Sequence, residues 1–167
     1  ILAPDPILRK KATKVIEIDS TIIKILNDMT ETMYNAPGIG LAAQQVGLLK
    51  RLIVMDCSKD EKKPSLCKMI NPEIIRKSDK ITKMEEGCLS LPGFNAEIKR
   101  YSNVTVSFDD INGEKNEFEA EGLEAVCLQH EIDHLNGILF IDHLTRLKKD
   151  IIWRKILKDN KSKKNNS

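Results

Sequence analysis

The chain has 167 residues, of which 41% are hydrophobic and 31% are charged. This length and composition are typical of a globular domain with its own core, and they exclude a largely disordered chain. No apolar run approaches the roughly 20 residues that span a bilayer, so we expect no membrane association. The four cysteines form no Cys-x-x-Cys pair, which indicates reduced thiols in a cytosol-like compartment rather than a disulfide framework.

The first half of the chain combines one helical pattern with two strand-like segments. Apolar residues at helical spacing predict a helix from Ser20, as its N-cap, to about Tyr34, and a Pro-Gly turn follows its end. Apolar runs at 51–56 and 69–75 predict buried strands. The small-residue stretch 38–47 connects the helix to the first of these strands.

In the second half, a hairpin precedes a helix. Alternating apolar residues at 104–108 and 118–120, with Asn-Gly at 112–113 between them, predict two antiparallel strands and a tight turn. Apolar residues at helical spacing from about Glu121 predict a helix that Gly137 ends. Strands followed by helices indicate the α+β class.

The C-terminal segment is strongly basic. Residues 144–167 carry nine Lys or Arg and two Asp, a net charge of +7, which leaves −5 for the rest of a chain with a total of +2. We expect one catalytic domain over 1–157, closed by an amphipathic helix, and a disordered basic tail over 158–167. Such a tail is either a solvated surface or a contact for nucleic acid.

Two of only three histidines lie four residues apart in the second predicted helix. On a helix, His130 and His134 would share one face and could bind one metal ion, with Glu131 beside them as a general base. This concentration favours a metal site over two unrelated surface histidines.

A third protein ligand must come from elsewhere. Zinc proteases with this motif often use a further downstream histidine, but Phe140 occupies that position and His143 follows three residues later. We expect His143 to be an ordinary surface or packing residue. Cys88, in the turn-like segment 87–89, is a better candidate, because a thiolate with two imidazoles leaves a fourth position for water. A buried free cysteine in a loop is the open alternative.

A glycine pattern also needs weighing. The spacing Gly38-x-Gly40-x-x-Ala43 imitates a dinucleotide-binding fingerprint, which follows a strand and opens a helix. Here a predicted helix and the segment 35–37 precede it. We therefore expect no nucleotide cofactor.

Three motifs resemble the signature motifs of the peptide deformylases, in the same order. They are Gly38-Ile39-Gly40-Leu41-Ala42-Ala43-Gln44-Gln45, Glu86-Gly87-Cys88-Leu89-Ser90 and Gln129-His130-Glu131-Ile132-Asp133-His134. The likeness covers nearly the whole chain. It implies mainly antiparallel sheets around a central metal-binding helix, with an N-terminal and a C-terminal helix. It also implies a metal-dependent hydrolase that removes the formyl group from the N-terminal formylmethionine of newly made polypeptides and releases formate.

The resemblance assigns roles around one divalent metal ion. Cys88, His130 and His134 would hold the ion, and Glu131 would accept and return the proton of the attacking water. Fe²⁺ is the implied native ion, while Zn²⁺, Ni²⁺ and Co²⁺ also suit such ligands. Asp133 is expected to orient a ligand imidazole.

Further residues are implied in substrate binding. The side-chain amide of Gln45 and the backbone N–H of Leu89 would donate to the oxyanion. The implied methionine pocket consists of Ile39, Gly40, Leu123 and Val126. Asn95 stands where some family members carry an arginine, so a charged substrate contact there is not carried over.

Two other enzyme classes stay open. A zinc endopeptidase would need a ligand in place of Phe140, and a cysteine hydrolase would use Cys88 as its nucleophile. For a deformylase, the implied partners are N-formylmethionyl nascent peptides, and the basic C-terminal region resembles a ribosome-contacting helix. The expected location is the bacterial cytoplasm, with an organellar origin left open.

Overall fold

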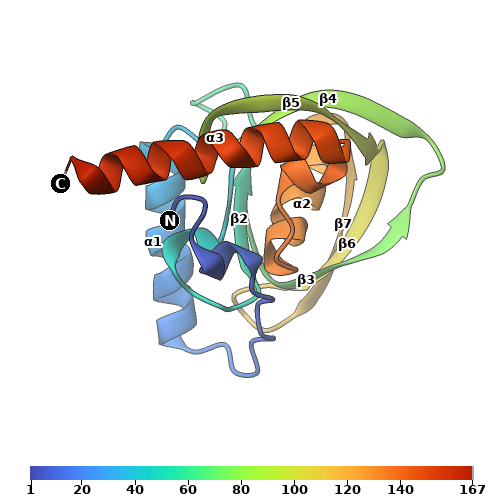
Figure 1. The fold of residues 1–167 in the computed structure, drawn as a ribbon. Coiled ribbons are helices and arrows are strands. Elements are labelled where there is room, and N and C mark those ends of the chain that lie inside the picture. The colour runs from blue at the N-terminus through green and yellow to red at the C-terminus, as the bar shows by residue number, and fades with distance from the viewer. Residues whose placement is uncertain (167) are drawn as a thin grey trace.

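The computed structural model describes residues 1–166, and within them seven strands form two sheets around and beside three α-helices (Figure 1). The helices are α1 (Ser20–Asn35), α2 (Gly122–Leu135) and α3 (Arg146–Asn165), and the short 3-10 helices are η1 (Pro6–Arg9), η2 (Ala43–Val46) and η3 (Phe140–His143). The strands are β1 (Gly40–Ala42), β2 (Leu52–Asp56), β3 (Leu66–Lys77), β4 (Ile81–Cys88), β5 (Leu91–Tyr101), β6 (Asn103–Asp109) and β7 (Lys115–Glu121). No helix among the described residues is long and apolar enough to cross a membrane. The predicted α+β class is confirmed.

The larger sheet is antiparallel throughout and has the order β1-β2-β3-β6-β7. The strands predicted at 51–56 and 69–75 correspond to β2 and β3, and the predicted hairpin corresponds to β6 and β7. Gly113 has a φ of +80° in the turn of that hairpin, a conformation that favours glycine. The predicted turn chemistry therefore matches the structure.

The second sheet is the β4–β5 hairpin, which the sequence analysis does not predict. Its register runs from Ile81 opposite Tyr101 to Cys88 opposite Leu91. Lys83 and Lys99 lie directly opposite each other on its exposed face. Because that face is charged and few residues are fully buried, the apolar alternation that marks a strand is weak here.

The N-cap residue of helix α1 lies one position before the predicted one. The side chain of Asp19, rather than Ser20, accepts a hydrogen bond from the N–H of Ile22 and is the N-cap. The predicted apolar stripe is buried against β2 and its neighbours, and it consists of Ile22, Leu26, Met29 and Met33.

Helix α2 lies inside the molecule, between the two sheets (Figure 1). Ten of its 14 residues are buried, so polar side chains on this helix face the interior rather than solvent. Gly137 follows it with a φ of +74°, and a Cβ atom there would come within 2.4 Å of the carbonyl oxygen of Arg9. The predicted stop at Gly137 thus serves both the turn and the close approach of η1.

The prediction of a disordered tail over 158–167 is wrong for the described residues, because α3 continues to Asn165. Thr145 caps the start of α3, and Ile156 is buried in a cluster with Leu8, Leu91 and Phe140. Beyond Ile156 the helix is rich in lysine, a good helix former. A high charge content therefore does not end the helix here.

Candidate active site

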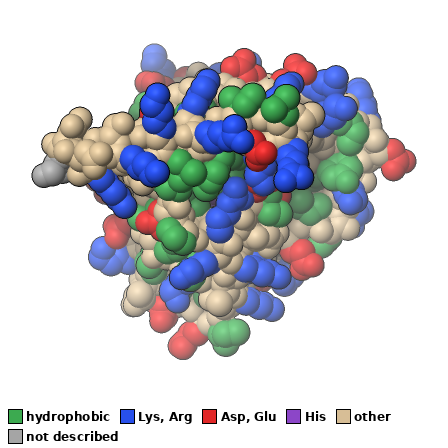
Figure 2. Space-filling view, viewed as in Figure 1, with side chains coloured by type: hydrophobic (Ala, Val, Ile, Leu, Met, Phe, Trp, Pro, Cys, Tyr) green, Lys and Arg blue, Asp and Glu red, His purple; other side chains and the backbone are tan. Residues whose placement is uncertain are grey.

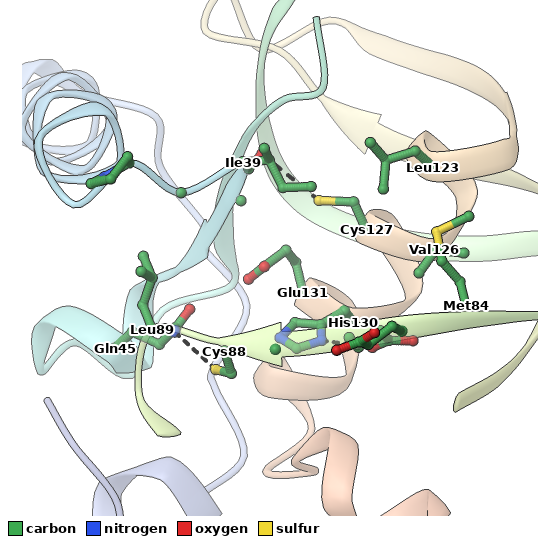
Figure 3. Close-up of a pocket in the computed structure, with 16 residues that line it drawn as sticks. Ile39, Gln45, Met84, Cys88, Leu89, Leu123, Val126, Cys127, His130 and Glu131 are labelled. Carbon is green, nitrogen blue, oxygen red and sulfur yellow. Dashed lines mark hydrogen bonds and ion pairs between the residues drawn. The ribbon is translucent and has the colours of Figure 1, made fainter. Parts of the chain in front are cut away.

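One cavity of about 370 Å³ opens between three segments of the chain. The segment 37–40 before and at the start of β1 forms one wall, the end of β4 forms another, and α2 forms the base (Figure 3). Glu131 and His130 project from α2 into this space, while Cys88 and Gln45 approach from the opposite side (Figure 3).

The three predicted metal ligands converge at this cavity. Cys88 is the last residue of β4, directly before the two-residue connection to β5, while His130 and His134 are one helical turn apart on α2. One ligand atom from each residue lies within 4.8 Å of the other two. The Cys88 Sγ atom is 3.3 Å from Nε2 of His134. One thiolate and two imidazoles at this separation suit a divalent transition-metal ion.

Glu86, which the sequence analysis quotes without a role, fixes the orientation of His130. Its Oε1 atom lies 2.9 Å from Nδ1 of His130. With the proton on Nδ1 donated to this carboxylate, Nε2 keeps its lone pair toward the cavity, as a metal ligand requires. The side chains therefore fit the predicted ion.

Arg100 is the second residue that the sequence analysis misses. Its Nε and Nη2 atoms donate to the two oxygens of Glu86 at 2.8 and 2.9 Å. Burial alone would raise the pKa of Glu86, but hydrogen bonds from Arg100 and His130 lower that pKa to about 2. Glu86 is thus held as a carboxylate behind His130.

Asp133 does not orient a metal-binding imidazole, so that prediction is wrong. Its Oδ2 atom accepts from Nη1 of Arg100 at 2.6 Å and lies 2.7 Å from Nε2 of His143. Because Asp133 is on α2, this contact ties Arg100 to the helix that carries the histidines. The side chain of His143 is 37% exposed, in keeping with a packing role.

Glu131 has the burial expected of a tuned acid–base group. It is only 4% exposed, and its Oε2 atom receives no hydrogen bond from the described residues. Burial raises the pKa of Glu131 to about 7, against the opposing effect of His130. A carboxyl group with a pKa near neutrality can both accept and return a proton.

Gln45 and Leu89 lie on the far side of the cavity from Glu131. The Oε1 atom of Gln45 accepts from the N–H of Ala42 at 2.9 Å, which fixes the amide orientation. Its Nε2 atom then donates to Ser90 Oγ at 3.2 Å and to Cys88 Sγ at 3.5 Å. Leu89 lines the cavity in the connection after β4. The two predicted oxyanion donors are therefore close to the ligand cluster.

The four residues predicted to bind methionine all line the cavity, and they are Ile39, Gly40, Leu123 and Val126. Ile39 and Leu123 are 43% and 36% exposed, so they form its mouth. Phe140, at the position where some zinc proteases use a histidine, is buried and stacks on His130 with a centroid distance of 6.1 Å. It completes the apolar support of the site and cannot be a ligand.

The polypeptide deformylase family model matches residues 1–150. The chain belongs to this family. A peptide deformylase from Agrobacterium fabrum is 46% identical over 98% of this chain and 96% of its own length. One from Thermodesulfovibrio yellowstonii is 53% identical over 91% of this chain and 92% of its own length.

Solved structures of deformylases share the fold. The crystal structure of peptide deformylase from Ehrlichia chaffeensis superposes with a TM-score of 0.90 at 37% identity, covering 98% of this chain and 96% of that one. The plant peptide deformylase PDF1B gives a TM-score of 0.91 at 35% identity, covering 100% and 91%. The deformylase from Synechococcus elongatus, solved with actinonin, gives 0.86 at 43% identity, covering 92% and 84%. The similarity thus includes the sheets, α2 and the cavity between them.

Proposed function

We propose that this chain hydrolyses the formyl amide of N-formylmethionyl peptides and releases formate, with one divalent metal ion as its cofactor. The observation that carries this proposal is the convergence of Cys88, His130 and His134 beside a cavity that the buried Glu131 lines. Family membership supports the same reaction. Nascent peptides with a formylated N-terminus are accordingly the substrates.

We assign the metal to Cys88, His130 and His134, with Fe²⁺ as the native ion and Zn²⁺, Ni²⁺ or Co²⁺ as alternatives that the same donors accept. When bound, such an ion lowers the pKa of a coordinated water and polarises a carbonyl oxygen. The chain itself contributes the orientation of His130 through Glu86 and the packing of Phe140 against the His130 ring.

In this proposal Glu131 handles the proton. Its Oε2 atom accepts the proton that the attacking water loses, and it later delivers that proton to the nitrogen of the departing amine. The Nε2 amide hydrogens of Gln45 and the backbone N–H of Leu89 donate to the oxygen that becomes negative as the formyl carbon turns tetrahedral. Ile39, Gly40, Leu123 and Val126 enclose the methionine side chain.

The first test compares Glu131→Ala with the unsubstituted chain in formate release from formyl-Met-Ala-Ser. We expect kcat to fall about 100-fold or more, because the general base is lost. Metal content should be unchanged, because Glu131 is not among the ligands. Glu124→Ala, on the same helix but outside the cavity lining, should keep full turnover. Undiminished turnover in Glu131→Ala would contradict the proposal.

A chelator separates this mechanism from a cysteine hydrolase. Removal of the metal should abolish formate release, and restoring Zn²⁺ or Fe²⁺ should recover it, whereas a thiol nucleophile would keep working.

We further propose that residues 1–157 act as one catalytic unit and that the protein works in the cytoplasm of a bacterium or in an organelle.

We also propose that the C-terminal part of α3 binds the ribosome. Several Lys and Arg side chains lie along the visible face of α3, between hydrophobic and uncharged ones (Figure 2), and residues 144–167 carry a net charge of +7. Chains lacking residues 158–167 should sediment with ribosomes much less than the complete chain. Binding of the complete chain should weaken steeply between about 50 and 200 mM salt, as phosphate contacts do. Equal, salt-independent sedimentation of both chains would refute this.

A further inference from the structure

Three of the four cysteines lie together beside the cavity and have no part in the proposed reaction. Cys57 directly follows β2, Cys67 is in β3, and Cys127 is in α2. Cys67 is opposite Met55 in the β2–β3 register, and residues two apart along a strand share a face, so Cys57 and Cys67 are on the side of Met55. That side packs against α2, and both thiols contact the core cluster that contains Cys127.

Cys57 and Cys127 lie beside the same carbonyl group, because Ile39 accepts from the N–H of Asp56, the residue before Cys57, at 2.8 Å and from the Cys127 thiol at 3.8 Å. A hydrogen bond with Cys57 is the main cause that raises the pKa of the Cys127 thiol, and burial adds to it. The pKa of Cys67 is raised mainly by burial. The charge of Glu124 is the next largest cause, and Cys57 has a smaller effect. Cys57 is half-buried and Cys127 is buried, so a reagent from solvent meets Cys57 first.

Cys127 also holds one wall of the cavity. Its thiol donates to the carbonyl oxygen of Ile39 with a separation of 3.8 Å (Figure 3). A Cβ atom at Gly40 would lie only 2.8 Å from its sulfur, so the sulfur and the backbone of β1 are in close contact. Any movement of this sulfur therefore changes the segment that lines the methionine pocket.

We propose that Cys57 and Cys127 form a reversible disulfide that reshapes the cavity, with low-molecular-weight disulfides as the oxidant. This proposal rests on the proposed function only for its effect on catalysis. The Cys57 sulfur attacks one sulfur of glutathione disulfide, which leaves a mixed disulfide and one glutathione. Cys127 then attacks the Cys57 sulfur and expels the second glutathione. The protons of the two protein thiols end on the two glutathione molecules.

The disulfide removes the S–H donor and draws the Cys127 sulfur toward the end of β2. The carbonyl of Ile39 then keeps only the hydrogen bond from the N–H of Asp56, at 2.8 Å, and the contact between Cys127 and Gly40 opens. We expect a weaker fit for the methionine side chain, expressed as a higher KM. Glu131 and the metal ligands are on other positions of α2 and β4, so kcat changes little.

The test uses the complete, zinc-loaded chain, because zinc has no redox chemistry of its own. After incubation with glutathione disulfide, non-reducing peptide mapping should find a Cys57–Cys127 link with zinc content unchanged. KM for formyl-Met-Ala-Ser should rise about tenfold, as expected for one altered apolar contact in a pocket. Dithiothreitol should restore both. Cys57→Ser should form no link and keep its KM, and the matched variant Cys67→Ser should behave as the unsubstituted chain.

Several outcomes would overturn the inference. They are a glutathione adduct that stays on Cys57, a link to Cys67 or Cys88 instead, and a Cys57–Cys127 link that leaves KM unchanged. Should Cys57→Ser unfold, Cys57→Ala serves the same comparison. A reduced, zinc-loaded chain that releases no formate would contradict the proposed function, whereas the peptide map decides separately whether the disulfide forms.

Discussion

At the scale of single residues, the imidazole of His130, one of the two proposed to bind the metal, depends on the charges behind it. Arg100 is only 5% exposed, yet it is an ion-pair partner of both Glu86 and Asp133. Glu86 in turn bonds Nδ1 of His130. Removing one member of a buried ion pair leaves the other charge without compensation, which typically destabilises by about 3–5 kcal/mol.

We predict that Arg100→Leu weakens both folding and metal binding. The free energy of unfolding should fall by about 3–5 kcal/mol, because Glu86 and Asp133 lose their partner. Zinc affinity should fall about 10–100-fold, because Glu86 no longer holds His130 in place. Urea unfolding and competition with a chromophoric chelator measure the two quantities.

Lys99→Ala, next to Arg100 but exposed, is the matched control and should change neither quantity. If Arg100→Leu does not fold, Arg100→Lys retains a charge and permits the affinity measurement. An unchanged zinc affinity in a folded Arg100 variant would show that Glu86 orients His130 without help.

The residues of the site differ in how far the sequence predicts them. The i, i+4 spacing of His130 and His134 is a local pattern, and the resemblance then supplies Cys88. The pairing of Glu86 with Arg100 depends on the β4–β5 register, which no local pattern displays. Long-range partners of this kind need the folded chain.

At the scale of elements, a hydrogen bond joins α1 to β2. The hydroxyl of Tyr34, near the end of α1, donates to Asp56 Oδ2 at 2.5 Å. Burial would raise the pKa of Asp56, but hydrogen bonds from Tyr34, Ser58 and Ser65 lower it from 3.8 to about 2. The bond to Asp56, with burial adding to it, raises the pKa of Tyr34 from 10.0 to about 12. The Tyr34 hydroxyl therefore stays protonated and the Asp56 carboxylate stays ionised across the neutral pH range, as this bond requires.

The direction of the pH dependence follows from these values. Asp56 stabilises the fold fully above its ordinary pKa of 3.8, and this contribution is lost as pH falls toward about 2. Tyr34 stabilises the fold below 10.0, and its contribution is lost as pH rises through about 12.

Tyr34→Phe should accordingly lower the free energy of unfolding by about 1 kcal/mol at neutral pH, since the ring is partly exposed. The difference from the unsubstituted chain should shrink at pH values below 3.8. Tyr101→Phe is the control, because its hydroxyl accepts from Lys77 instead of donating to a carboxylate. A Tyr34→Phe difference that is constant between acid and neutral pH would contradict the assignment.

Elements with strong periodicity are predicted well, and those without it are not. The stripe on α1 and the alternation in β6 and β7 mark buried faces, which the structure confirms. The β4–β5 hairpin has a charged outer face and lacks that signal. The end of α3 is held by tertiary contacts near Ile156 and by lysine propensity, and charge content alone predicts it wrongly.

At the scale of the whole molecule, the basic charge is set apart from the cavity. Helix α3 attaches to the body through Ile156 and through the ion pair of Lys149 with Asp142, at 2.8 Å. Asp142 also pairs with Arg9 near the N-terminus. Because both anchors precede residue 158, the chain without 158–167 should keep its formate release while losing ribosome affinity.

The proposed ligand donors belong to different layers of the fold, since Cys88 ends a strand of the hairpin and the two histidines are on α2. An ion bound by all three residues would connect the hairpin to α2. Its affinity for the native state adds to the stability of the protein by mass action, about 2.7 kcal/mol at a free concentration near 100 times Kd. Scarcity of the ion would thus lower abundance along with turnover, since a loosened hairpin exposes strand edges to proteases.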